Sequence, residues 1–187
     1  MRTLIVTAFV SLDGVMEAPG GEPGYRNTGW TFKDIEPDMA AYEIKGREQE
    51  EATALLLGRR SYEIFAPVWP QMEEFAAYNA MPKYVVSTTD PDTSLWNNTS
   101  VLRSLDEVAA LKETEGGPII VNGSSRLAQS LAAAGLVDRY HLLVFPVVLG
   151  DGNRLWANQD QEKTRLRLVE HETYGNGVQK QVWDVVS

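Results

Sequence analysis

The segment between Pro118 and Gly152 constrains the fold of this chain more than any other. It reads as a buried strand at 118–121, a turn of small residues at 122–125, a helix at 126–134 and a second strand at 139–148. A strand that leads through a helix into another strand predicts a parallel sheet. The turn leaves free backbone N–H groups at the positive end of a helix dipole, where an anion, most often a phosphate, binds. Two interpretations of this turn are equally supported. Either it binds a nucleotide phosphate, or Gly123 only permits a tight turn.

The composition limits the possible classes of protein. The chain has 187 residues, of which 43% are hydrophobic, and we expect one domain over residues 1–187. The absence of cysteine excludes disulfides, thiolate metal sites and a cysteine nucleophile, and is typical of a reducing compartment such as the cytoplasm. A net charge of -9 repels nucleic acid and anionic lipid, so we expect neither as a partner. Residues 1–16 fit a buried strand better than a signal peptide, and no apolar run is long enough to span a membrane.

Strand and helix patterns alternate along the rest of the chain. Further strands are predicted by apolar runs at 4–10, 53–57, 84–87 and 101–102. Further helices are predicted at 37–51, from Gly58 to about Phe65, and at 104–112 with Ser104 as the cap. Gly175-Asn176-Gly177 predicts the turn of a C-terminal hairpin formed by 165–174 and 178–186. The pattern predicts an α/β fold of three layers, with helices on both faces of a mostly parallel sheet and the hairpin as an antiparallel edge.

Polar or glycine residues follow four of these strands, at the carboxyl ends where parallel sheets bind ligands. They are Ser11–Gly14, Gly58–Ser61, Ser87–Thr89 and Asn122–Ser125. Together they bring two helix N-termini, two arginines and several hydroxyls to one edge of the sheet. This inventory suits a cofactor with a pyrophosphate and a further phosphate. Arg59 or Arg60 can bind a phosphate through two hydrogen bonds, although both could instead be the solvated first turn of a helix.

Several other site classes find no support in the sequence. It contains neither a G-x-G-x-x-G nor a P-loop motif, and no serine elbow or catalytic triad signature. His141 and His171 both fall in predicted strands without metal-ligand spacing. We therefore expect structural roles for both histidines and no metal site.

Four segments carry a resemblance to a known family: SLDG after the first strand, LLLGRRSYE, KYVVST, and NGSSRLAQSLAAAGLVDRYHLLVFPVVLGDG. In their order and spacing they resemble the dihydrofolate-reductase-like superfamily over residues 3–186. Within it, the chain is most similar to the C-terminal reductase domain of the bacterial riboflavin-biosynthesis deaminase/reductase, as a stand-alone member. The resemblance implies an NADPH-binding reductase fold, a small-molecule substrate and a homodimer.

The resemblance also implies roles for individual residues. The pyrophosphate and the adenosine phosphate side would be held by Gly58, Arg59, Arg60 and Ser61. The adenosine 2′-phosphate would be approached by Ser87 and Thr88. The second phosphate turn would consist of Gly123, Ser124, Ser125 and Arg126. The nicotinamide pocket would be lined by backbone groups of Ala8 and Phe9, and the substrate would be faced by Asp13. The superfamily often has Gly-Gly in the second phosphate turn; with Ser124 after Gly123, a cis peptide bond would cost about 3 kcal/mol.

Asp13 is the first candidate for substrate orientation or proton delivery, with an Asx turn that opens the long loop 13–29 as the equal alternative. Trp30 could stack on a planar substrate, or anchor the loop in the core, which we favour. Asp38 and Glu43 on the first helix are further carboxylates, and we expect both to be solvated.

We therefore expect an NADPH-dependent reductase of a small heteroaromatic substrate, either pterin-like or 5-amino-6-(5-phosphoribosylamino)uracil-like. Riboflavin biosynthesis is the nearest named pathway. The alternative is a non-catalytic nucleotide-binding or regulatory module that keeps the fold.

Overall fold

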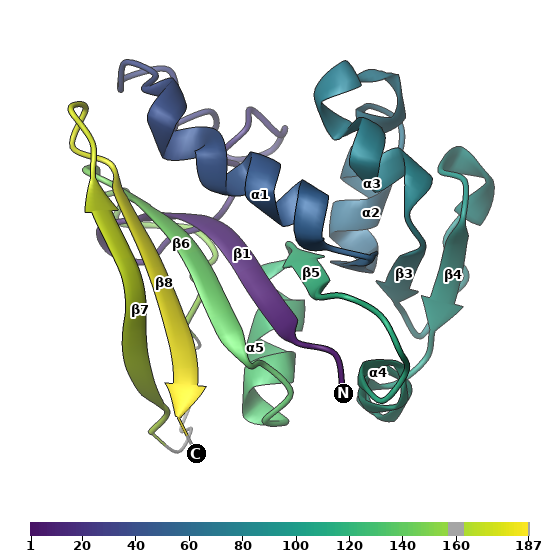
Figure 1. Ribbon diagram of the computed structural model, residues 1–187. Coiled ribbons are helices and arrows are strands. Elements are labelled where there is room, and N and C mark those ends of the chain that lie inside the picture. Colours follow the sequence, from purple (N-terminus) through teal and green to yellow (C-terminus); the bar gives the residue numbers. More distant parts are fainter. Residues whose placement is uncertain (157–162, 187) are drawn as a thin grey trace.

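An eight-stranded sheet runs through the centre of the computed structural model, which describes residues 1–156 and 163–186 (Figure 1). The strand order is β4-β3-β2-β5-β1-β6-β8-β7. From β4 to β6 in this order the strands are parallel, and β8 pairs antiparallel with both β6 and β7. The strands are β1 (Leu4–Ser11), β2 (Ala54–Gly58), β3 (Lys83–Val86), β4 (Thr99–Leu102), β5 (Ile119–Asn122), β6 (Arg139–Phe145), β7 (Arg165–Thr173) and β8 (Gln179–Val186).

Helices cover both faces of this sheet (Figure 1). One face carries α1 (Glu43–Glu51), α2 (Arg59–Phe65) and α3 (Ala76–Ala80), and the other carries α4 (Leu105–Lys112) and α5 (Ser125–Ala133). The short 3₁₀ turns are η1 (Met39–Tyr42), η2 (Trp69–Gln71), η3 (Glu73–Phe75) and η4 (Thr93–Leu95). Tyr62 and Tyr78 join the apolar cluster on the first face, and Val108 and Leu131 join the cluster on the second. The predicted three-layer α/β fold, with a mostly parallel sheet and a C-terminal antiparallel hairpin, is confirmed.

The main differences from the predicted elements lie at their ends. β6 stops at Phe145, earlier than expected, because Pro146 has no N–H for a strand that pairs on both sides. The expected helix at 37–51 begins as η1, capped by Asp38, and continues as α1. The sequence predicted no element at α3, since its 5 residues are too few to show a helical period.

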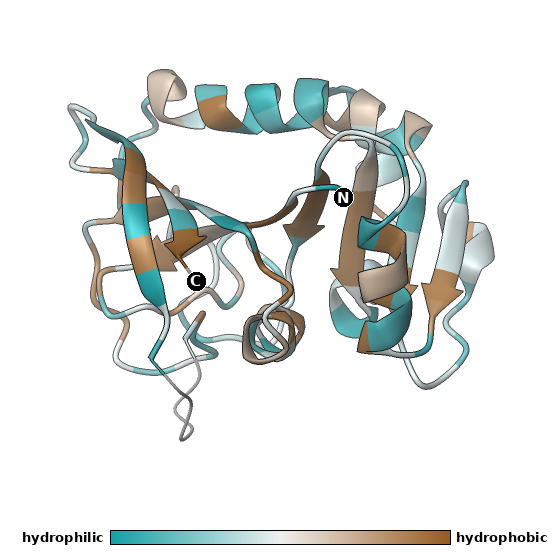
Figure 2. Cartoon of the chain, turned by 60° about the horizontal axis from the view of Figure 1, so that its bottom comes forward, coloured by the Kyte–Doolittle hydropathy of each residue, from teal (hydrophilic) through white to brown (hydrophobic). Residues whose placement is uncertain are grey.

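α1 covers the middle of the sheet although most of its residues are polar (Figure 2, where it crosses the top of the view mainly in teal). Its buried residues are Ile44 and Glu48. A carboxylate under a helix must find hydrogen-bonding and charged partners there, because an unpaired buried charge is strongly unfavourable. The partners of Glu48 are therefore part of what this helix positions.

β7 forms one outer edge of the sheet and pairs only with β8. Its register against β8 shifts between Leu168 and Glu170, where a residue bulges out of the ladder. Leu168 and Val169 at this point are 47% and 49% exposed. Within the described residues, no helix combines the length and apolar character needed to cross a bilayer.

Candidate cofactor and active site

The two predicted phosphate turns touch each other at the carboxyl edge of the sheet. Gly58 ends β2 and caps α2, and Gly123 follows β5 with a φ of +68°. A Cβ atom added to Gly58 would lie 2.6 Å from Ser124 Oγ, and one added to Gly123 would lie 2.7 Å from Ser61 Oγ. Both glycines are therefore required by the close approach of the turns, and Gly123 by its left-handed backbone as well.

The second turn opens α5. The peptide bond between Gly123 and Ser124 is cis, the form that costs free energy when the second residue is not proline. Ser124 caps the helix, because its side chain accepts a hydrogen bond from Leu127 N. Ser125 and Arg126 form the first turn, and the Arg126 side chain is exposed. The N–H groups at this end of α5 lie beside Gly58, as an anion site between the two turns requires.

The charged residues of the first turn face solvent. Arg59 and Arg60 are exposed, whereas Ser61 is buried against Gly123. Among the described residues, Arg59 has one weak partner, Glu63, at 3.7 Å on the next turn of α2. A cation at a helix N-terminus opposes the dipole, and this long contact leaves Arg59 available for an anion.

A third turn follows β3 and contains an arginine that the sequence reasoning missed. The Ser87 hydroxyl donates to Thr89 O at 2.9 Å and accepts from Thr89 N, while Thr88 between them is exposed. Arg103, which follows β4, donates to the carbonyls of Ser87 and Thr89 and pairs with Asp90. The signal available in the sequence was a cationic residue directly after β4, the strand that pairs with β3. Arg103 brings positive charge to the turn expected to meet the 2′-phosphate.

Ala8 and Phe9 lie on opposite faces of β1. Ala8 joins the apolar cluster beneath α5, and Phe9 packs edge-to-face on Tyr42 and Phe145 on the α1 side. The pairing of β5 with β1 ends opposite Thr7, while β6 continues alongside β1 to Ser11. In the described sheet, backbone groups of β1 beyond Thr7 have no neighbouring strand on the β5 side, so this stretch can meet a ligand.

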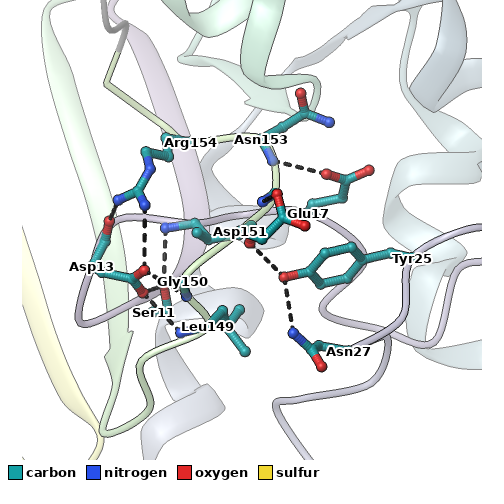
Figure 3. A network of polar contacts seen from close by, with 12 residues as sticks. Ser11, Asp13, Glu17, Tyr25, Asn27, Leu149, Gly150, Asp151, Asn153 and Arg154 are labelled. Atoms are coloured by element: carbon teal, nitrogen blue, oxygen red, sulfur yellow. Dashed lines mark hydrogen bonds and ion pairs between the residues drawn. The ribbon is translucent and has the colours of Figure 1, made fainter.

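Asp13 takes part in a network between two loops (Figure 3). Its carboxylate accepts from Ser11 Oγ at 2.7 Å and from the N–H groups of Leu149 and Gly150 at 3.1 and 2.9 Å, with Arg154 at 3.4 Å. Burial raises the pKa of Asp13, but these hydrogen bonds outweigh it and lower the pKa to about 2. An ionised carboxylate with this many donors is a poor proton donor near neutral pH, so the geometry favours a role for Asp13 in holding the loop over proton delivery, and its part in catalysis stays a prediction.

The rest of the long loop is tied down in the same region (Figure 3). Glu17 accepts from Asn153 N at 2.8 Å, and the Tyr25 hydroxyl donates to Asp151 O at 2.6 Å. Trp30 is 2% exposed, and its Nε1 donates to Glu17 O at 2.8 Å. Because the Trp30 ring is buried edge-to-face against Phe145, the structure favours the loop anchor over substrate stacking.

The other two carboxylates lie away from the turns. Asp38 caps η1 and lines a cavity of about 620 Å³ beside Pro146 and Asn176, while Glu43 is exposed. This cavity lies at the β7–β8 turn, not at the paired glycines.

Polar side chains cross the centre of the sheet under α1, and the sequence reasoning did not find them as a group. Asn122 on β5, Thr7 on β1 and His141 on β6 are neighbours in register. Glu48 of α1 accepts from Thr7 Oγ1 at 2.7 Å and lies 2.9 Å from His141 Nδ1. Lys45 donates to Thr7 Oγ1 and lies 3.4 Å from Glu48 Oε2. We call these five residues the buried cluster.

Electrostatics keep Glu48 ionised in this position. Burial raises the pKa of its carboxyl, but the charge of Lys45 and the hydrogen bonds with His141 and Thr7 together lower the pKa below its usual range. Burial also raises the pKa of the nearby Tyr78 phenol, and the charge of Glu48 raises it further, while a hydrogen bond with Asn122 opposes the rise. The sequence signal was a threonine and a histidine inside apolar strands, facing a Lys–x–x–Glu pair on a helix.

His171 lies on exposed β7, away from this cluster. Among the described residues, no three His, Cys, Asp or Glu side chains gather as metal ligands would.

Comparisons with known proteins agree with this architecture. The uncharacterized protein YyaP of Bacillus subtilis is 28% identical over 187 residues, covering 95% of this chain and 92% of YyaP. A pyrimidine reductase-like protein from Corynebacterium diphtheriae superposes with a TM-score of 0.67 at 15% identity, covering 99% of this chain and 92% of that one. Dihydrofolate reductase from Enterococcus faecalis, solved with NADP(H), has a TM-score of 0.62 at 15% identity, covering 99% and 97%. The family model of the RibD C-terminal domain matches residues 2–180, so the chain belongs to the RibD C-terminal domain family and has its reductase-type fold.

Proposed function

We propose that this protein is an NADPH-dependent reductase of a small heteroaromatic substrate, either pterin-like or 5-amino-6-(5-phosphoribosylamino)uracil-like. The observation that carries the proposal is the contact between the two glycine turns at the N-termini of α2 and α5. A Cβ atom on either glycine would collide with a serine hydroxyl of the other turn, so the two glycines let the turns come together, which fits a cradle of backbone N–H groups for a pyrophosphate. The NADP(H) complex of the Enterococcus faecalis reductase supports the choice of cofactor.

Each part of the edge has a task in this proposal. The start of α5 and Gly58 bind the pyrophosphate through backbone groups. Arg59, the Ser87–Thr88 turn and Arg103 bind the 2′-phosphate, because a dianion there needs cations and hydroxyl donors. The unpaired stretch of β1 at Ala8 and Phe9 lies beside the nicotinamide. NADPH supplies a hydride when it is bound, and the protein orients the substrate and provides a proton.

Asp13 positions the site without touching the reacting atoms. Its carboxylate holds the end of β1 to the N–H groups of Leu149 and Gly150. Trp30 holds the same loop in the core through Glu17. The two residues thus form a rigid wall at the end of β1.

The setting of the protein follows from the same proposal. We expect a homodimer that acts in the cytoplasm and that binds no nucleic acid, metal or membrane. The net charge of -9 and the lack of cysteine support this setting. Sedimentation velocity measures the oligomeric state.

In the first experiment the protein is titrated with NADPH and with NADH, and the affinity for each is measured by fluorescence. Arg59→Ala should weaken NADPH more than NADH, because only NADPH carries the 2′-phosphate. Arg167→Ala is the matched control and should change neither affinity. Arg167 lies on the outer strand β7, and its side chain is 72% exposed. Equal losses for the two cofactors would contradict the role of Arg59.

The second experiment follows NADPH oxidation with a panel of pterins and aminopyrimidine ribosyl phosphates. Turnover with one class identifies the substrate. Tight NADPH binding without turnover on any of them would favour the alternative of a non-catalytic nucleotide-binding or regulatory module. No binding at millimolar NADPH would refute the cofactor and both functions.

A further inference from the structure

The buried cluster connects the proposed cofactor edge with a cavity on the other side of α1. In the order of strands, Asn122 lies on the side of the glycine turns and His141 on the side of the C-terminal hairpin. Beyond His141 is a cavity of about 170 Å³, lined by residues of α1, β6, β7 and β8. The polar groups therefore cross the sheet between apolar residues of the same face, such as Ile5 and Leu143, with Arg139 beside His141 at the cavity.

The two ring nitrogens of His141 have different surroundings. Nδ1 lies 2.9 Å from Glu48 Oε1. Since an ionised carboxylate only accepts hydrogen bonds, Nδ1 carries the proton. The described residues contain no buried polar side-chain atom without a partner, and within them the ring makes no second hydrogen bond. Nε2 is therefore reached by solvent, which enters where the ring lines the cavity.

Lys45 lies at the other end of the cluster. Its ammonium donates to Thr7 Oγ1 and is 3.4 Å from Glu48 Oε2. It also lies 4.9 Å from the centre of the Phe9 ring, on the stretch of β1 proposed to meet the nicotinamide. The Lys45 side chain is 21% exposed, while that of Glu48 is fully buried. Lys45 is thus the member of the cluster that can touch a ligand.

We infer that Lys45 is the proton donor of the reduction, and that Glu48 and His141 form a relay that returns a proton to it from the cavity. The inference rests on the proposed reductase function and adds to it the donor and the proton route. Lys45 is the catalytic residue here, because it touches the substrate. Glu48, Thr7 and His141 act through Lys45.

The proton and electron balance is complete. The carbon of a C=N or C=O bond in the substrate gains the hydride, and the cofactor is oxidised. The nitrogen or oxygen of that bond takes a proton from the Lys45 ammonium, which becomes an amine. His141 then accepts a proton at Nε2 and passes its Nδ1 proton to Glu48. Glu48 passes a proton to the amine, directly or through the Thr7 hydroxyl, which restores Lys45 and Glu48. His141 is left with its proton on Nε2, and it regains the Nδ1 tautomer by exchanging protons with solvent, with no net change in charge.

Charged groups at the cavity set the conditions for the entry of protons. Arg47 and Glu51 face it from α1, Arg139 from β6 and Glu170 from β7. Arg47 binds Glu170 at 2.9 Å, so two of these charges neutralise each other. On the inner side, Lys45 and Tyr78 are the titratable groups next to Glu48. Glu48 and His141 therefore lie among charges that are largely paired.

The kinetic test compares the first turnover with later ones after rapid mixing of NADPH-loaded protein and substrate. Lys45→Arg keeps a cation beside Glu48 but cannot lose a proton, so the first turnover should slow by about 10²–10⁴-fold. His141→Gln keeps an N–H donor for Glu48 but cannot relay a proton. Its first turnover should match wild type, because Lys45 starts protonated, and only later turnovers should slow.

Other kinetic outcomes would overturn the inference. Equal slowing of first and later turnovers in His141→Gln would mean a structural role for His141. Unchanged later turnovers would mean that Lys45 regains its proton from solvent without the relay. An unchanged first turnover in Lys45→Arg would exclude Lys45 as the donor.

A second test needs neither cofactor nor substrate. The chain has 2 histidines, so ¹⁵N NMR of a His171→Gln protein reports His141 alone. We expect a protonated Nδ1, with an Nε2 resonance that responds to pH and to small buffer acids. Glu48→Gln should shift the Nδ1 resonance. A bare Nδ1, or an Nε2 that never gains a proton, would refute the relay.

The two tests separate the inference from the function on which it rests. If wild-type protein binds NADPH but reduces nothing, the proposed function fails while the NMR result stands by itself. If wild-type protein is active, a wild-type result for Lys45→Arg refutes Lys45 as the donor and one for His141→Gln refutes the relay, while the proposed function stands.

Discussion

The carboxyl edge of the sheet and the buried cluster beneath α1 use opposite means to hold polar groups in place. At the edge, Gly58 and Gly123 let two turns meet, and the groups offered to a ligand are mostly backbone N–H groups. In the buried cluster, Lys45 and Glu48 of α1 meet polar side chains of β1 and β6 on a largely apolar face. The edge depends on the absence of side-chain atoms, whereas the cluster depends on the presence of several at once.

This difference decides what each region tolerates. A turn of small residues fails when a single atom is added where there is no room. A buried ion pair fails when one partner is removed, because the remaining charge stays buried without compensation. Three substitutions test this distinction, and they are described in order of decreasing effect.

Lys45→Met should have the largest effect on stability. Without the ammonium, the fully buried Glu48 carboxylate loses its countercharge, and breaking a buried pair costs about 3–5 kcal/mol of unfolding free energy. Urea unfolding measures this loss. Lys33→Met is the control, because Lys33 is exposed, and it should be close to neutral. A small loss for Lys45→Met would place the cluster in the same class as surface ion pairs.

Gly58→Ala should cost about 1–3 kcal/mol, since its Cβ would lie 2.6 Å from Ser124 Oγ. Ser124→Ala removes the obstructing atom and the cap of α5, at a cost of about 1 kcal/mol. The double variant should therefore lose less than the sum of the two, as thermal unfolding would show. Gly46→Ala in α1, with nothing within 4 Å, is the control and should be neutral or stabilising. Strict additivity would mean that the turns do not press on each other.

Asp13→Asn tests whether a charged side chain also stabilises the carboxyl edge of the sheet. Its pKa is lowered to about 2 in the folded protein, so its stabilising effect is complete above the unfolded pKa near 4 and is lost as the pH falls towards 2. We expect about 1–2 kcal/mol after allowance for solvent screening. Asp13→Asn should remove this part of the pH dependence of unfolding. Asp34→Asn, at an exposed position, should leave the pH dependence unchanged. Parallel curves for wild type and Asp13→Asn would show that the carboxylate does not hold the loops.

The same contrast explains what the sequence could predict. The order of strands and helices along the chain, the three layers and the glycine turns each depend on residues close together in the chain, and these were predicted. The buried cluster unites positions 7, 45, 48, 122 and 141, and only the pairing of β1 with β5 and β6 brings them into one row. Asp13 was recognised as important, but its task could not be read, because its partners Leu149 and Gly150 lie far along the chain. For the same reason the sequence favoured a loop anchor for Trp30 without excluding stacking on a substrate, and the contact with Phe145 is the observation that it lacked.

The irregular edge strand β7 has a consequence for how the protein behaves at high concentration. An outer strand exposes backbone groups that can pair with another chain and start aggregation. In β7 the ladder is interrupted between Leu168 and Glu170, and the strand carries Arg167, Glu170 and Glu172. Any strand that adds to this edge must accommodate both the bulge and the charges, so pairing is confined to short stretches. The edge that presents apolar side chains to solvent is thereby protected against open-ended sheet growth.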